Sequence, residues 1–170
     1  MREAEYAAMR ATIRERGTAR MALLPLVFVG WAGTAVATAA VITVAVSTLV
    51  PLLVLVAGFE AIFALHLNVE RIGRYLQVFH EPDDDGWEHI AMAYGQRYPG
   101  SAPDPLSSRL FVLATSVNFL PAALGGEFFP EVVVLAVLHL LFVNRIRVAR
   151  LFAARQRAED LERFSSLKRG

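Results

Sequence analysis

One ionisable side chain stands at the end of a long apolar stretch and is the first candidate for chemistry. Glu60 directly follows the run from Met21 to Phe59, which contains no Asp, Glu, Lys, Arg or His. A helix rises about 1.5 Å per residue, so Glu60 lies about 16 Å from Arg71, where we place a membrane surface. A charged carboxylate at this depth is costly unless it is protonated or has a partner. We expect either a proton or cation site, or a ligand to a pigment or metal, or a structural hydrogen bond to one of Thr34, Thr38, Thr43, Thr115, Ser116 and Asn118.

Two histidines form the second candidate constellation. His66 and His139 precede Arg71 and Arg145, the first arginines at the ends of their apolar segments, by five and six residues. Their depths therefore differ by only about 1.5 Å. On facing helices, two such histidines would ligate haem axially, and one alone would suffice for the magnesium of a chlorophyll-type pigment. The alternative is that each only donates or accepts a hydrogen bond between helices.

Sequence motifs that carry catalysis are missing from the chain. It has no nucleophile–base arrangement, no glycine-rich phosphate loop and no HExxH zinc pattern. It also has no cysteine, which excludes disulfides, thiolate metal sites and cysteine catalysis. The sequence therefore predicts a protein that is not an enzyme and has no metal site.

The elements that position these residues are predicted from the apolar runs. Hydrophobic residues make up 55% of the chain and charged residues 19%. The run from Met21 to Phe59 is about 58 Å long as a helix, nearly two crossings of a ~30 Å hydrocarbon core. The runs Leu110–Gly126 and Val132–Val143 are short, but arginines at their ends extend them by snorkelling. We expect an all-α polytopic membrane protein with four transmembrane helices as two antiparallel hairpins, or a re-entrant second hairpin.

Five regions follow from this interpretation. They are a basic amphipathic N-terminal helix (1–20), a first transmembrane hairpin with a cytoplasmic helical stem (21–79), an acidic, proline-rich cytoplasmic connection with a short interfacial helix (80–108), a second transmembrane hairpin (109–144) and a basic C-terminal helix (145–170). Gly17 is expected to end or loosen the first helix. Ser47 and Thr48 are expected to cap a turn before Pro51, in the first turn of the next helix.

The basic residues predict the orientation. All 17 Lys and Arg lie in Met1–Arg20, Arg71–Arg109 or Arg145–Arg169, and the short loops between paired segments have none. The positive-inside rule places these three regions in the cytoplasm. We therefore expect a protein of a bacterial inner (cytoplasmic) membrane, with both termini in the cytoplasm.

The basic stems suggest contacts with anionic lipid or with a partner protein. Each charge near an anionic membrane surface contributes about 1 kcal/mol to binding. Nucleic acid is not expected, because only one aromatic side chain, Phe152, stands between Arg145 and Arg157 to stack on bases. The predicted lipid or partner contacts are Arg71, Arg74, Trp87, Arg145, Arg147 and Arg150.

Three functions compete. The leading hypothesis is a non-catalytic accessory or scaffold subunit that packs against other subunits of a larger respiratory or photosynthetic membrane complex, because small residues such as Gly30, Gly33 and Ala37 let helices approach closely. The first alternative is a small homo-oligomeric ion or proton channel or transporter that uses Glu60. The second alternative is a haem- or pigment-binding electron-transfer subunit that uses His66 and His139.

Overall fold

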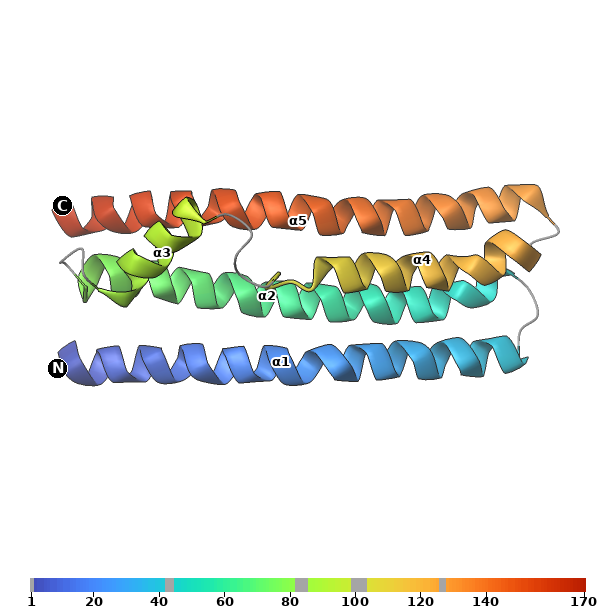
Figure 1. Ribbon diagram of the computed structural model, residues 1–170, viewed down its shortest axis with the longest axis horizontal. Coiled ribbons are helices and arrows are strands. Elements are labelled where there is room, and N and C mark those ends of the chain that lie inside the picture. Colours follow the sequence, from blue (N-terminus) through green and yellow to red (C-terminus); the bar gives the residue numbers. More distant parts are fainter. Residues whose placement is uncertain (1, 42–44, 82–85, 99–103, 126–127) are drawn as a thin grey trace. The chain divides into compact units, whose positions relative to one another are not determined.

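The computed structural model describes residues 2–41, 45–81, 86–98, 104–125 and 128–170, and the regular structure in these ranges is entirely helical (Figure 1). The prediction of an all-helical protein is confirmed. Four helical segments are long and apolar enough to cross a membrane: α1, η1 with α2, α4 and α5. In chain order the elements are α1 (Arg2–Val41), the 3₁₀ turn η1 (Ala45–Thr48), α2 (Leu49–Phe79), α3 (Trp87–Arg97), α4 (Ser108–Gly125) and α5 (Phe129–Arg169).

The first helix is longer than predicted. It passes through Gly17 and Pro25 without a break and ends at Val41, so the prediction that Gly17 ends the helix is wrong. A glycine inside a helix costs only about 1 kcal/mol relative to alanine, and the many flanking turns offset that cost. In the 3₁₀ turn η1, the Thr48 hydroxyl donates to the Ala45 carbonyl at 3.0 Å.

The chain forms two compact units, which we describe separately. The polar unit comprises Met1–Arg20, Ala64–Pro105 and Leu151–Gly170; the apolar unit comprises Met21–Phe63 and Leu106–Arg150. In the apolar unit, the buried ring of Phe59 meets the rings of Phe111 and Phe142 edge-on, at centroid distances of 5.2 and 5.9 Å. Such pairs contribute about 0.5–1.5 kcal/mol beyond the area that they bury, so these rings join α2 to α4 and α5.

A close approach between α1 and α2 depends on Gly58. A Cβ atom at this position would overlap both methyl groups of Val27, whereas a Cβ at Gly33 would have no neighbour within 4 Å. Val27 is buried and its β-branched side chain has little rotamer freedom, so it cannot move aside. Glycine at position 58 therefore sets the distance between the two helices.

We predict that Gly58→Ala lowers the free energy of unfolding by about 1 kcal/mol. Overpacking costs about 1–3 kcal/mol, and the better helix propensity of alanine offsets about 1 kcal/mol of it. Gly33→Ala is the matched control and should be neutral or stabilising, because it has the same propensity gain without the overlap. Reversible unfolding of the full-length protein in mixed detergent micelles measures both. Equal shifts in the two variants would contradict the packing argument.

Candidate functional site

A buried polar cluster occupies the apolar unit, and we call it the Asn118 cluster: Trp31, Thr48, Asn118 and His139. The Asn118 amide nitrogen donates to the Thr48 carbonyl at 2.9 Å and to His139 Nε2 at 3.0 Å. Its oxygen accepts from Trp31 Nε1 at 3.1 Å. An indole nitrogen only donates, so the amide orientation follows from this contact. One asparagine thereby joins α1, η1, α4 and α5.

The cluster also defines the protonation of His139. Its Nδ1 lies 2.7 Å from the Leu135 carbonyl, which only accepts, so Nδ1 carries the proton. Its Nε2 accepts from the Asn118 amide. The imidazole is therefore neutral and both ring nitrogens are engaged inside the chain. A haem or pigment metal at Nε2 would have to displace Asn118.

A groove of about 290 Å³ lies beside the Asn118 cluster. Its walls come from α1, η1 and the facing turns of α2 and α4, and most of its surface is apolar. Small residues of α1, among them Ala35 and Ala39, form one wall, and Asn118 lies on the opposite side. The volume of the groove is sufficient for a large apolar side chain of another helix.

Glu60 forms an ion pair with Arg145, at 2.8 Å between Oε2 and Nη2. The guanidinium of Arg145 also lies over the Phe63 ring, 4.9 Å from its centroid. Among the described candidates, no hydroxyl or amide bonds to Glu60; the candidate Thr43 lies outside the described residues. Arg145 was predicted to contact lipid or a partner protein; within the chain, its long side chain reaches the carboxylate of Glu60. The candidate site at Glu60 is therefore a charge pair and not an isolated acid.

His66 belongs to the polar unit and is buried. Its Nδ1 lies 3.3 Å from Nη1 of Arg20, which only donates, so Nδ1 accepts and the proton sits on Nε2. His139 belongs to the other unit. Axial ligation of one haem by the two histidines stays a prediction. Within the described ranges, no group of three or more His, Asp or Glu residues is placed to hold a metal ion.

The polar unit contains a second ion-pair cluster, which contradicts the predicted role of Arg74. This arginine is 6% exposed and donates to Gln77 Oε1 at 2.7 Å and to Glu88 Oε2 at 3.3 Å. Arg10 of α1 pairs with Glu88 at 2.7 Å and with Glu81 at 2.6 Å. Arg74 is thus a buried structural residue and does not contact lipid, because α3 folds back onto α2 and covers it.

The remaining predicted contact residues are accessible. Trp87 is 68% exposed, and Arg147 and Arg150 are exposed on α5. Arg71 is also exposed, but its Nε donates to Asp160 Oδ2 at 3.2 Å, so it also pairs within the polar unit. These positions stay predicted contacts with lipid or partner.

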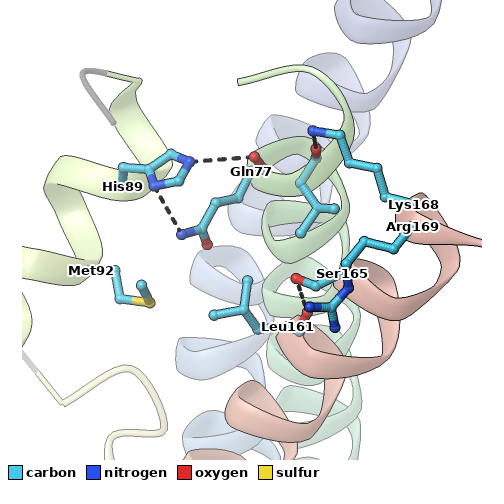
Figure 2. A pocket seen from close by; sticks show the side chains of 8 residues that line it. Gln77, His89, Met92, Leu161, Ser165, Lys168 and Arg169 are labelled. Carbon is cyan, nitrogen blue, oxygen red and sulfur yellow. Dashed lines mark hydrogen bonds between the residues drawn. The ribbon is translucent and has the colours of Figure 1, made fainter. Parts of the chain in front are cut away.

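A cavity of about 450 Å³ in the polar unit is lined by residues of α2, α3 and the end of α5. Figure 2 shows their side chains. His89 Nε2 lies 2.9 Å from the Glu81 carbonyl and 3.3 Å from that of Gln77. Lys168 donates to the Val78 carbonyl at 2.7 Å. A cation at the C-terminal end of α2 compensates the helix dipole. These bonds attach α3 and the end of α5 to α2, so we interpret the cavity walls as structural.

Comparison with known proteins finds no matching family model, no matching curated protein and no matching solved structure. The fold therefore defines the class: an all-helical protein with four helical segments that are long and apolar enough to cross a membrane. Its function has to be argued from the contacts of its own residues.

Proposed function

We propose that this protein is a non-catalytic accessory subunit of a larger membrane complex. Its four apolar helices cross a bacterial inner membrane as two antiparallel hairpins, and both termini lie in the cytoplasm. The distribution of Lys and Arg supports this orientation. The partners are other membrane proteins that pack against its helices.

One observation carries the proposal: the apolar part of α1 is hardly buried by the rest of the chain. In its most apolar 18-residue window 6% of the residues are buried, compared with 44% in the η1–α2 segment and 33% in α4. The open face includes the small residues Gly33, Ala37 and Ala40. Lipid chains pack against large side chains as well as they pack against small ones. Small residues have a particular advantage only against another helix, because they let its backbone come close. We infer that this face of α1 packs against another protein.

The groove beside the Asn118 cluster supports the same interpretation. It borders α1, and its walls are mostly apolar. A large apolar side chain of a neighbouring helix would fill it and gain burial that the chain alone does not provide. The partner helix is thus expected to combine close backbone contact at Gly33 with one inserted side chain.

Two contacts weigh against the rival functions. A cation passing Glu60 would meet the positive charge of Arg145, 2.8 Å from the carboxylate, which disfavours a cation channel through this residue. Haem ligation through His139 would cost the hydrogen bond from Asn118. The role of an accessory subunit requires neither the passage of a cation at Glu60 nor the ligation of haem by His139.

We predict that Gly33→Leu combined with Ala37→Leu releases the partner while the chain stays folded. A leucine at position 33 has open space around its Cβ, so the fold tolerates it, but it blocks close approach of another helix. The matched control is Ala57→Leu with Ala61→Leu, two exposed small residues at the same spacing on α2. The mass of the complex extracted from native membranes in mild detergent measures the effect. If the α1 pair leaves this mass unchanged, or both pairs lower it equally, the proposal fails.

A further inference from the structure

A second groove in the apolar unit, of about 410 Å³, gathers arginines without any carboxylate. It lies between the start of α4 and the middle of α5, and we call it the arginine groove. Its lining combines three arginines with three apolar side chains. Its lining residues are Ser108, Arg109, Val112, Leu113, Ser116, Ile146, Arg147 and Arg150.

The three arginines of this groove differ from the six described arginines that form ion pairs within the chain. The paired ones are Arg10, Arg71, Arg74, Arg145, Arg157 and Arg163. Within the part of the chain that the structure describes, no carboxylate lies within ion-pair distance of Arg109, Arg147 or Arg150. Three guanidinium groups that line one groove without a carboxylate give the groove a positive charge. The charge of the groove therefore calls for an anionic ligand.

The apolar residues of the groove indicate that the ligand also has an apolar part. Val112 and Leu113 lie one turn along α4 from Arg109, and Ile146 is beside Arg147 on α5. The start of α4 adds the positive end of a helix dipole next to the arginines. A ligand that fits has a compact anionic group joined to an apolar chain.

We propose that the arginine groove binds one anionic phospholipid. The phosphate is held by the guanidinium groups of Arg109, Arg147 and Arg150, which match phosphate oxygens in bidentate geometry. An acyl chain lies along Val112, Leu113 and Ile146. The inference rests on the proposed membrane insertion, which puts the arginines of the groove at headgroup level.

Native mass spectrometry of the full-length protein in detergent tests the site, with phosphatidylglycerol and phosphatidylcholine as probes. Replacing Arg109, Arg147 and Arg150 together with Gln should weaken phosphatidylglycerol binding roughly a hundredfold, at about fivefold for each arginine. Phosphatidylcholine adducts should not change. The matched control removes the same charge elsewhere, through Arg14→Gln, Arg16→Gln and Arg155→Gln, and should keep the phosphatidylglycerol adducts. Equal loss in the two triple variants would overturn the proposal.

A second variant tests the apolar residues of the groove without changing any charge. Leu113→Trp fills the path of the acyl chain and should weaken phosphatidylglycerol binding about tenfold. Leu113 is 60% exposed, so the larger ring does not disturb the core. Circular dichroism and the elution volume verify that each variant is folded. Wild-type binding in this folded variant would overturn the acyl-chain assignment, and displacement of the lipid by inorganic phosphate would show a phosphate site instead.

Alkaline carbonate extraction separates this inference from the proposed function. A protein that stays in the membrane but binds phosphatidylglycerol no better than phosphatidylcholine would overturn the lipid site alone. A protein that carbonate releases from membranes would overturn membrane insertion and, with it, the lipid site. Retention in the membrane with selective binding supports both.

Discussion

Asn118→Leu is expected to lower the free energy of unfolding by about 2–4 kcal/mol. The substitution removes three hydrogen bonds and leaves Trp31 Nε1, His139 Nε2 and the Thr48 carbonyl without their partner. Hydrogen bonds between membrane helices average about 0.6 kcal/mol and reach about 1.7 kcal/mol each. Leaving buried polar groups unpaired adds to the loss. Unfolding of the purified protein by SDS in mixed micelles measures the change.

The control for this substitution is Ser116→Ala, two residues earlier on α4. The Ser116 hydroxyl is exposed and donates only to the Val112 carbonyl, 2.9 Å away on its own helix. Its removal should change the free energy of unfolding by less than about 0.5 kcal/mol. His139→Leu removes the hydrogen bond between His139 and Asn118, which Asn118→Leu also removes. The double variant should therefore lower the free energy of unfolding by less than the sum of the two single variants. If Asn118→Leu is as mild as Ser116→Ala, the cluster does not stabilise the fold.

Breaking the Glu60–Arg145 pair is the second large effect that we expect. Glu60→Leu leaves the Arg145 charge without a partner at the Phe63 ring, and Arg145→Leu leaves the carboxylate alone. Each single substitution should cost about 1–3 kcal/mol, because the charge that remains has lost its partner within the membrane. The double variant removes both charges and should cost less than the sum of the singles. Unfolding in mixed micelles gives the coupling energy.

A substitution at Glu60 distinguishes an accessory subunit from an ion channel. Glu60→Gln keeps an oxygen for Arg145 but removes the carboxylate charge. In proteoliposomes, the scaffold proposal predicts that proton and cation flux does not differ between the wild-type protein and this variant. A wild-type flux that Glu60→Gln abolishes would favour the channel alternative. Strict additivity of the two leucine variants would show that the ion pair does not contribute to stability.

Much of the helical architecture could be predicted from the sequence, because it depends on patterns along the chain. The end of α2 at Phe79 and the short helix from Trp87 both agree with the structure. The continuity of α1 through Gly17 was missed, because a local propensity cannot show how much the neighbouring turns stabilise a long helix.

The partners of the candidate residues were harder to predict. Counting residues gives a height along one helix, but neither the rotation of that helix nor the reach of a long side chain. Asn118 and His139 were each recognised as polar groups in apolar segments, and only the structure shows that they bond to each other. For the same reason Arg145 was predicted only as a contact with lipid or a partner protein, and its pairing with Glu60 was not predicted.

The contacts that could not be predicted from the sequence join residues of separate segments. Arg74 looked like a surface charge, because nothing in its own segment indicates that Glu88 of α3 returns to cover it. Arg109, Arg147 and Arg150 looked like independent interfacial arginines. They form one groove only because α4 and α5 pack side by side in the apolar unit. A local sequence window does not contain such information.

The mass and composition of the protein extracted from native membranes in a mild detergent test the central claim most directly. We predict a complex that contains this 18.7 kDa chain and other membrane proteins in a fixed ratio. The Gly33→Leu and Ala37→Leu variant should release the chain from that complex. A species composed only of copies of this chain, unchanged by the variant, would contradict the proposal of an accessory subunit.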